Sequence, residues 1–517
     1  MNKTFINEPE RDFSQKEQCK ALQEAISAAE KELGQDYPLI IDGEKVMTEK
    51  KIVSVNPCKK AEIVGRVSSA SQEDADRAIT AAAAAFETWR LVPAQVRADY
   101  VARLIGILQR RRSAMAAWMI LETGKNYGEA DGEICEAIDF FNSYSLFACE
   151  MDREGIALVD SAVENNRAVY IPIGVGLIIP PWNFPFSIMA GMAISAVLTG
   201  NTVVIKCASD SPVVAYKFCE MCEEAGFPQG VINFLPGSGG EIGDYVVAHP
   251  KTRFINFTGS REVGLRINSI AAQISPGQRW IKRVVAEMGG KNAIIVDSSA
   301  NLELAASGVA TAAFGFQGQK CSACSRAIVT ADVYDEFVRL LKKEAARFTT
   351  GEGKNNPPMC AVISQKAFNS ITGYIEQGKK EATLVTGGQY SDSKGFYIEP
   401  TVFADVPETA VIANDEIFGP VTAVIKAADF DDALRIANAT LYALTGAVYT
   451  SDRKNIEKAK AHFNVGNLYF NRKCTGAVVL NHPFGGFDMS GTNAKTGTRD
   501  YLSNFLQIKS ISENIAW

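Results

Sequence analysis

The sequence lacks any concentration of positive charge. Lysine and arginine number 53 against 59 acidic residues, which gives a formal net charge of −6, and the basic residues are dispersed along the chain. Proteins that bind nucleic acid usually carry a clustered basic surface that neutralises phosphates. We therefore expect no nucleic-acid partner.

A secretory signal is also lacking. Residues 1–13, MNKTFINEPERDF, are polar and contain no apolar run of the kind that a signal peptide needs. The eleven cysteines are odd in number and scattered through a long chain, which is typical of a reducing compartment rather than of a disulfide framework. These features predict a cytoplasmic protein.

One uncharged stretch, residues 168–205, is long enough to cross a bilayer. Four prolines and the polar residues Asn183 and Asn201 interrupt it. Its pieces are typical of a strand, a loop, a helix and a second strand buried inside an α/β domain. We therefore expect no membrane-spanning segment.

The standard nucleotide and metal motifs are missing as well. Residues 237–243 fail the G-x-G-x-x-G spacing because Ile242 occupies the sixth position, and Leu265 stands where a P-loop lysine would follow Gly264. The C-x-x-C pairs at 219/222 and 321/324 lie about 100 residues apart, too far for a zinc ribbon. We expect no bound metal, and a thioredoxin-like redox pair is only slightly more plausible.

What is present indicates a large α/β enzyme. A chain of 517 residues exceeds one hydrophobic core, so two or three domains are expected. From Arg167 onward, apolar runs of strand length alternate with helical stretches, which predicts a mainly parallel, doubly wound sheet. The expected strands are 175–179, 202–206, 231–235 and 253–257, and the helices between them are 188–198, 213–225 and 240–248.

A second α/β block is expected from about residue 293 to 471, with the boundary near Gly289–Gly290. Helices are predicted before the first block, and Gly124 ends the third of them. Their ranges are 16–33, 72–91, 94–123 and 127–149.

The segment Phe314–Arg326, FGFQGQKCSACSR, places Cys321 behind two glycines and beside Lys320. This polar, partly basic setting favours an accessible thiolate, the form of cysteine that attacks carbonyl carbon. A buried structural cysteine is an equal alternative from this segment alone.

Three other positions have the residue types of a catalytic site. Glu287 ends an apolar strand beside two glycines, where a carboxylate can act as a general base, and a solvated glutamate is the simpler alternative. Asn183 lies in the rigid loop PPWNFP and could donate to an oxyanion. Thr258-Gly259-Ser260 joins a strand to a helix, as in phosphate-binding turns, although an ordinary turn has the same pattern.

The order of the motifs is more specific than any one of them. PPWNFPF, IKCASDSP, FTGSREVG, EMGGK, GFQGQKCSACSR and NDEIFGPV resemble, in this order, the NAD(P)-dependent aldehyde dehydrogenase superfamily, over nearly the whole chain from about Tyr37. Within it, FNVGNLYFNRKCTGA and HPFGGFDMSGTNAKTG resemble the enzymes that oxidise L-glutamate γ-semialdehyde to L-glutamate in proline and arginine catabolism.

The resemblance implies a mechanism. Cys321 would attack the aldehyde, and the Asn183 amide together with the Cys321 backbone N–H would hold the oxyanion of the thiohemiacetal. After oxidation to a thioester, Glu287 would activate the water that hydrolyses it.

The same matching implies a set of cofactor contacts to ribose, pyrophosphate and nicotinamide. They are Trp182, Lys206, Ser209, Gly259, Ser260, Glu416 and Phe418. Many superfamily members have Lys-Pro-x-Glu where this chain has Lys206-Cys207-Ala208-Ser209. The acid that would repel a 2′-phosphate is absent, so NAD is expected and NADP use stays open.

The subfamily resemblance implies contacts to the amino-acid end of the substrate. Backbone N–H groups would bind its carboxylate, one acid would lie near its amino group, and two aromatic rings would form walls. These residues are Glu136, Phe184, Ser322, Gly476, Ala477 and Phe484.

The implied fold has a Rossmann-like cofactor domain, an α/β catalytic domain and a small β flap for oligomerisation. The expected ranges are 1–36 for an N-terminal helical arm, 37–156 and 172–288 for the NAD-binding domain, 289–489 for the catalytic domain, and 157–171 with 490–517 for the flap. A homodimer or larger homo-oligomer follows, because a hydrophobic edge strand in the tail needs a partner. A separate proline dehydrogenase is a candidate partner.

Alternatives remain open at this point. The nearest is an aldehyde dehydrogenase for another small semialdehyde, such as succinate semialdehyde. A CoA-acylating enzyme is disfavoured by Glu287, and a catalytically silent protein on the same fold is disfavoured by the intact Cys321, Glu287 and Asn183.

Overall fold

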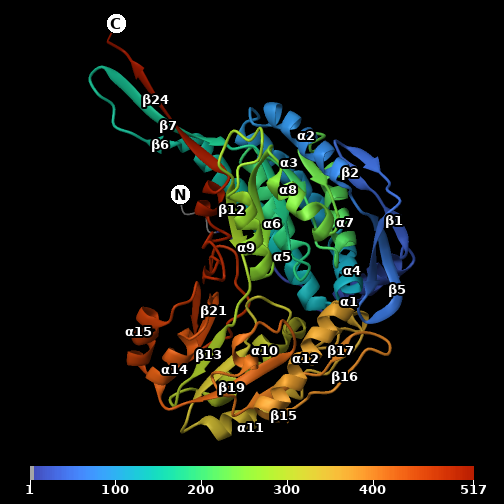
Figure 1. Ribbon diagram of the computed structural model, residues 1–517, viewed down its shortest axis with the longest axis vertical. Helices are drawn as coiled ribbons and strands as arrows, with labels where there is room; N and C mark the ends of the chain where they lie inside the picture. The colour runs from blue at the N-terminus through green and yellow to red at the C-terminus, as the bar shows by residue number, and fades with distance from the viewer. Residues whose placement is uncertain (1–4, 517) are drawn as a thin grey trace.

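The computed structural model describes residues 5–516, so the arm and flap ranges expected from sequence extend beyond it at residues 1–4 and 517. Two seven-stranded sheets, each covered by helices, form the body of the molecule, and a β arm projects from it (Figure 1). The predicted α/β class with two sheet-based blocks is confirmed. No helix in residues 5–516 has the length and apolar character needed to cross a membrane.

The first sheet has the order β12-β11-β8-β9-β10-β2-β3. Its strands are β12 (Arg283–Glu287), β11 (Thr252–Thr258), β8 (Val175–Ile179), β9 (Thr202–Ile205), β10 (Ile232–Phe234), β2 (Leu39–Ile41) and β3 (Glu44–Val46). The first five are parallel, whereas β2 pairs antiparallel with both β10 and β3. All four strands expected in this block are present, because buried parallel strands have nearly continuous apolar sequences.

Helices pack on this sheet and on one another. They are α2 (Gln72–Trp89), α3 (Ala94–Arg110), α4 (Arg112–Thr123), α5 (Tyr127–Glu154), α6 (Ser187–Leu198), α7 (Pro212–Glu224), α8 (Asp244–Ala248) and α9 (Arg261–Ala271). Ser71 begins α2 with a reciprocal capping box to Asp74. The expected helix at 240–248 starts as a π turn at Gly239–Gly243, where three glycines permit a wider turn, and only then becomes α8.

The single helix expected at 94–123 is wrong. Arg111 leaves helical geometry (φ −95°, ψ 12°), so the chain forms α3 and then α4. The break accompanies the burial of Arg112, whose guanidinium pairs with Asp131 of α5. Local sequence carries no sign of this distant partner.

The second sheet has the order β15-β18-β19-β14-β13-β21-β22, and only β15 is antiparallel. Its strands are β13 (Ala293–Val296), β14 (Arg326–Thr330), β15 (Thr383–Thr386), β18 (Thr401–Ala404), β19 (Val421–Ala427), β21 (Thr445–Tyr449) and β22 (Asn467–Phe470). Its helices are α10 (Leu302–Phe314), α11 (Tyr334–Ala345), α12 (Gln365–Glu381), α14 (Phe430–Asn438) and α15 (Arg453–His462). The strands expected at 293–297, 326–330, 421–425 and 468–471 are confirmed.

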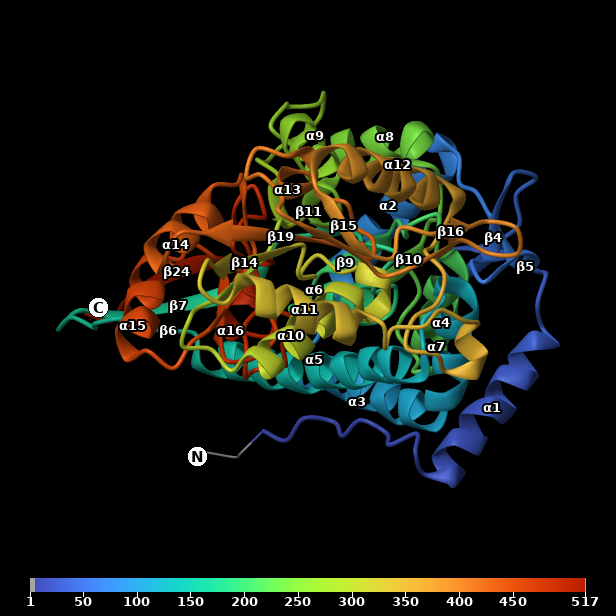
Figure 2. The same ribbon diagram turned by 90° about the horizontal axis from the view of Figure 1, so that it is seen from below.

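Four smaller sheets complete the described chain, two of three strands and two of two strands. The two-stranded sheets pair β16 (Tyr390–Ser391) with β17 (Tyr397–Ile398) and β20 (Tyr442–Ala443) with β23 (Phe487–Asp488), and the three-stranded sheets are described next. β1 (Gln35–Tyr37), β4 (Lys51–Asn56) and β5 (Lys59–Ser68) form one of them, and β5 was not expected from sequence. β6 (Ile156–Ala157), β7 (Glu164–Pro172) and β24 (Leu506–Asn514) form the projecting arm (Figure 1), where β24 runs antiparallel to β7. The edge strand expected in the C-terminal tail is therefore present. Near the N-terminus, α1 (Lys16–Glu30) packs on α4 (Figure 2).

Candidate active site

The turn that carries Cys321 has a backbone that is rare for residues with side chains. After α10, Phe316 and Gln317 have φ values of 49° and 56°, and Gly318 has φ 66°. A Cβ atom on Gly318 would lie 2.2 Å from the carbonyl oxygen of Gly419. Gln317 holds the turn in place by donating from Nε2 to backbone carbonyls of residues 124 and 361, at 3.0 and 2.9 Å. The glycine is needed because the turn packs directly on another backbone segment.

Gly290 of the EMGGK segment and Asn292, which follows that segment, hold the backbone of Cys321. Asn292 Nδ2 donates to the Cys321 carbonyl at 2.7 Å and to the Ala323 carbonyl at 2.9 Å. A Cβ atom on Gly290 would lie 2.7 Å from the Cys321 carbonyl oxygen. Asn292 was not identified from sequence, since a single asparagine entering a strand is no signal for catalysis.

The predicted thiolate-favouring role of Lys320 is wrong. Lys320 Nζ forms an ion pair with Glu129 of α5 at 2.8 Å. Burial, together with the nearby carboxylates of Glu416 and Glu287, raises the pKa of the Cys321 thiol to about 12. The sulfur lies in a partly buried residue and is predominantly protonated at neutral pH. Its neighbours Cys324 and Cys474 are both buried, and Cys474 Sγ donates to the Ser322 carbonyl at 3.3 Å.

Asn183 lies next to this turn. Its buried side chain donates from Nδ2 to the Gln319 carbonyl, two residues before Cys321, at 2.9 Å. A primary amide has two hydrogens, so this bond leaves the amide with a second donor beside the nucleophile. Such a donor is suited to an oxyanion that forms at a carbonyl attacked by Cys321.

Lys125 joins the Asn183 loop to the nucleophile turn. The lysine is fully buried, and its Nζ donates to the Asn183 carbonyl at 2.7 Å and pairs with Glu133 at 3.1 Å. The same ammonium lies 3.3 Å from the ring centre of Phe316 and 4.5 Å from that of Phe184. Burial lowers the pKa of Lys125, and Glu133 opposes this shift. Sequence offered no signal, because a lysine that follows a helix-ending glycine is normally solvent-exposed.

Glu287 is the last residue of β12, and glycines lie close to its carboxylate. Its Oε2 accepts from the Gly486 N–H at 3.2 Å, and Oε1 has no hydrogen-bond partner within residues 5–516. A Cβ atom on Gly485 or on Gly491 would lie 3.1 Å from Oε1. Burial raises the pKa of Glu287 to about 8, while the Gly486 N–H and Lys495 oppose the shift. A carboxylate with one unsatisfied buried oxygen and a pKa near neutrality can accept a proton from water.

The residues expected to hold a cofactor lie on loops of both large sheets. Lys206 follows β9, is buried, and forms no ion pair in the described part of the chain, so its ammonium fits a polar ligand. Glu416 accepts from the Gly290 N–H at 3.0 Å, and burial raises its pKa to about 7. Trp182 and Phe418 meet edge to face, with ring centres 5.5 Å apart. The contact between Trp182 and Phe418 joins a loop of the first sheet to a loop of the second.

Ser260 and Ser209 were also expected to contact the cofactor, but their side chains take no part in the contacts above. Ser260 caps α9, since its Oγ accepts from the Val263 N–H at 3.5 Å, and Gly259 precedes it at the end of β11. The hydroxyl is thus a helix cap, while the helix N-terminus itself retains the donors that bind phosphate. Ser209 is exposed on the loop after Lys206, and no contact joins it to the other predicted residues in the range described.

The residues expected at the substrate lie on four segments. The ring of Phe184 meets Phe316 edge to face at 6.2 Å. On α5, partial burial raises the pKa of Glu136 to about 7, and a hydrogen bond with Ser187 opposes the shift. The Ser322 carbonyl also accepts from Thr445 Oγ1 at 3.4 Å.

The fourth segment contains Gly476, Ala477 and Phe484. Gly476 has φ 75°, and its carbonyl accepts from Arg472 at 2.9 Å. Phe484 exchanges backbone hydrogen bonds with Thr496. Ala477, which follows Gly476 directly, is partly buried. No group of His, Cys, Asp or Glu suited to holding a metal is found in residues 5–516.

The comparisons with known proteins agree with this geometry. The model of the aldehyde dehydrogenase family matches residues 45–511. A 1-pyrroline-5-carboxylate dehydrogenase of Geobacillus thermodenitrificans (strain NG80-2) is 53% identical over 514 residues, which are 99% of this chain and 100% of the relative.

Solved structures are equally similar. A crystal structure of 1-pyrroline-5-carboxylate dehydrogenase from Thermus with bound NAD has a TM-score of 0.98 and 46% identity, with 100% of both chains covered. Proline utilization A from Bdellovibrio bacteriovorus has a TM-score of 0.97 and 44% identity over 99% of this chain and 54% of its own. With the family model matching most of its length and relatives about half identical over the full chain, this chain belongs to the aldehyde dehydrogenase family.

Proposed function

We propose that the protein oxidises L-glutamate γ-semialdehyde, formed from 1-pyrroline-5-carboxylate, to L-glutamate with NAD. The observation that carries the proposal is the similarity to 1-pyrroline-5-carboxylate dehydrogenases over the full chain at about half identity. The proximity of Glu287 to Cys321 and of the Asn183 amide to the turn that carries Cys321 supports it independently.

In the first step, the Cys321 sulfur attacks the aldehyde carbon, the S–H bond breaks, and the thiol proton passes to solvent water. The carbonyl oxygen becomes an oxyanion, and the free hydrogen of the Asn183 amide and the Cys321 backbone N–H donate to it. Lys125 holds Asn183 by its carbonyl, so that the amide does not have to reorganise as charge develops. The chemistry that NAD supplies when bound is acceptance of the hydride that turns the thiohemiacetal into a thioester.

In the second step, Glu287 removes a proton from water, and the resulting hydroxide attacks the thioester carbon. The C–S bond breaks, L-glutamate leaves, and the thiol of Cys321 is restored. The unpartnered Oε1 of Glu287 and the glycines around it leave room for this water.

We assign cofactor and substrate contacts within the same proposal. Cofactor contacts are Trp182, Lys206, Ser209, Gly259, Ser260, Glu416 and Phe418, and the buried unpaired ammonium of Lys206 supports a ribose contact. Substrate contacts are Glu136, Phe184, Ser322, Gly476, Ala477 and Phe484. The Thermus relative carries bound NAD, which supports NAD over NADP.

The proposal extends to the organisation of the protein. The domain ranges stay as expected from sequence, with the β arm as an oligomerisation flap. A homodimer or larger homo-oligomer is supported by exposed apolar side chains on the arm, such as Val159 and Ile508. A cytoplasmic location is supported by the eleven free cysteines. Similarity to proline utilization A supports a separate proline dehydrogenase as the partner that supplies substrate.

The test is NADH formation from 1-pyrroline-5-carboxylate, measured at 340 nm in parallel with succinate semialdehyde and with NADP in place of NAD. We expect the highest kcat/KM with 1-pyrroline-5-carboxylate and NAD, and none in a Cys321→Ala variant. Preference for succinate semialdehyde would replace the substrate proposed here, and unchanged NADH production by Cys321→Ala would refute the catalytic assignment.

A further inference from the structure

The N-terminal segment 7–13, here called the strap, lies outside the region that matches the family model. It runs in extended form beneath α5 and α3 before α1 begins (Figure 2). Because it contributes no helix or strand, its side chains and backbone must hold it in place. Phe13 packs edge to face on Tyr127 with ring centres 5.4 Å apart, and hydrogen bonds hold the residues before it.

Two carboxylates of α5 hold the strap backbone. Asp139 Oδ1 accepts from the Glu8 N–H at 2.7 Å, and Asp131 Oδ2 accepts from the Arg11 N–H at 2.8 Å. Hydrogen bonds to an ionised acceptor are stronger than neutral ones. The strap is therefore tied to α5 at two points, two helical turns apart.

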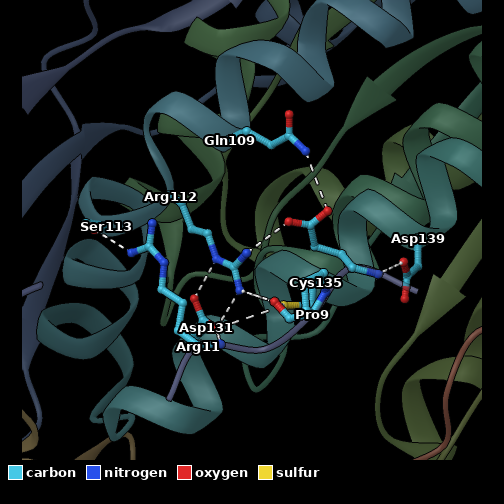
Figure 3. A network of polar contacts seen from close by, with 9 residues as sticks. Pro9, Arg11, Gln109, Arg112, Ser113, Asp131, Cys135 and Asp139 are labelled. Carbon is cyan, nitrogen blue, oxygen red and sulfur yellow. Dashed lines mark hydrogen bonds and ion pairs between the residues drawn. The ribbon is translucent and has the colours of Figure 1, made fainter. Parts of the chain in front are cut away.

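Arg112 fixes the middle of the strap (Figure 3). Its buried guanidinium donates to both oxygens of Asp131 at 2.7 Å, to the Pro9 carbonyl at 2.9 Å and to Glu8 at 3.0 Å. A fork of donors on a carboxylate restricts both partners to one geometry. The strap therefore has a defined position against α5.

The first residue of the strap reaches beyond α5. Asn7 Nδ2 donates to Asp139 Oδ2 at 2.8 Å and to the Val479 carbonyl at 3.1 Å. Both amide hydrogens are thus used, one on α5 and one on the loop 472–482. This loop contains Gly476 and Ala477, which the proposed function assigns to the carboxylate end of the substrate.

The loop 472–482 is braced internally, so a tie at one point restrains all of it. Arg472 donates to the Thr475 and Gly476 carbonyls at 3.0 and 2.9 Å and contacts His482 at 3.2 Å. The other ring nitrogen of His482 accepts from the Val478 N–H at 3.1 Å.

We propose that Asn7 is a positioning residue that holds the loop 472–482 in register with the α5 residue Glu136. Asp139 follows Glu136 by three residues on α5, so the two carboxylates are neighbours on one helix face. An amino-acid end has an ammonium and a carboxylate at a fixed separation, and the groups assigned to them lie on α5 and on the loop. Asn7 is hydrogen-bonded to both α5 and the loop, and it lies outside the set of residues assigned to the substrate. This inference rests on the proposed function.

The test is Asn7→Leu, which keeps the side-chain size and removes both donors. We expect the KM for the semialdehyde to rise about threefold to tenfold, the effect of losing one ordinary hydrogen bond, that to the Val479 carbonyl of the loop. The KM for NAD is expected to stay within a factor of two, and kcat likewise. Asp139→Ala should raise the semialdehyde KM similarly, and the double variant should add nothing to it.

The matched control is Ser113→Ala. It removes the strap contact from Arg11 Nη1 to Ser113 Oγ, at 2.6 Å, and touches neither Asn7 nor the loop. Its KM values should match the wild type. An Asn7→Leu variant with an unchanged semialdehyde KM, or with both KM values raised equally, would overturn the proposal.

Hydrogen exchange separates this inference from the proposed function. Amides 476–482 should exchange faster in ligand-free Asn7→Leu than in the wild type, whatever substrate the enzyme prefers. If the wild type does not oxidise the semialdehyde, the proposed function fails, and unchanged exchange in Asn7→Leu would refute the tie itself.

Discussion

Glu287 combines a buried setting with one oxygen left without a partner, and this combination controls the pH response. Its pKa is raised to about 8, so below that pH the side chain is mostly the neutral acid, which cannot accept a proton from water. We expect turnover limited by hydrolysis to rise as pH increases through about 8. A pH profile of kcat between 6 and 10 would measure this.

Glu287→Gln should remove this pH-dependent limb. It should also lower kcat by roughly 10²- to 10⁴-fold, the usual contribution of a general base. Because acylation of Cys321 is retained, rapid mixing should show a burst of NADH of about one per active site. A steady state with the wild-type pH profile would contradict the role of Glu287.

The buried Nζ atom of Lys125 both pairs with the carboxylate of Glu133 and holds the carbonyl of Asn183. Lys125→Met removes the bond to the Asn183 carbonyl and leaves Glu133 buried without its cation, which typically costs 3–5 kcal/mol. We expect a lower Tm together with a kcat reduced by about tenfold or more, since misplacing an oxyanion donor costs up to 10²–10³.

The double variant Lys125→Met/Glu133→Gln separates the two effects. It removes the uncompensated charge, so Tm should recover in part while kcat stays low. Lys354→Met, which breaks an ion pair with Glu30 on α1, is the control and should leave kcat unchanged. Recovery of kcat together with Tm would show that Lys125 acts on stability alone.

At the scale of elements, the turn between α10 and β14 is shaped by backbone contact. Gly318→Ala would place a methyl group 2.2 Å from the Gly419 carbonyl in a residue with φ 66°. We expect destabilisation of about 1–3 kcal/mol from backbone strain and a reduced kcat, because the turn positions Cys321. Thermal unfolding and steady-state kinetics would measure both.

Gly373→Ala is the matched control for this substitution. Gly373 lies inside α12, and a Cβ atom there meets nothing within 4 Å. Alanine is a better helix former than glycine, so this variant should gain about 0.5–1 kcal/mol and keep its kcat. Equal effects of the two variants would contradict the explanation from the turn.

At the scale of the whole molecule, the β arm leaves apolar side chains in solvent. Val159 is 89% exposed and Ile508 is 59% exposed. If the arm mediates self-association, Val159→Glu/Ile508→Glu should shift the assembly toward monomer, because burying two unpaired charges opposes association. Sedimentation velocity at micromolar concentration would measure the change, and a wild type that already sediments as a monomer would refute the oligomer.

The amino-acid sequence by itself determined the class of fold and the identity of the family. Strands such as β8 and β13 were predicted at their observed positions because a buried parallel strand is a short, continuous apolar run. The order of the short motifs around Asn183, Glu287 and Cys321 indicated an aldehyde dehydrogenase, since each motif is local in sequence.

Only the tertiary structure decided the electrostatics and the supporting contacts. The partner of Lys320 is Glu129, the pKa of Cys321 is raised rather than lowered, and Lys125 is buried beside Asn183. Each of these depends on residues brought together from distant parts of the chain. Burial and pairing are properties of the folded environment, so a pattern of neighbours in sequence predicts where a reactive side chain lies but not its charge.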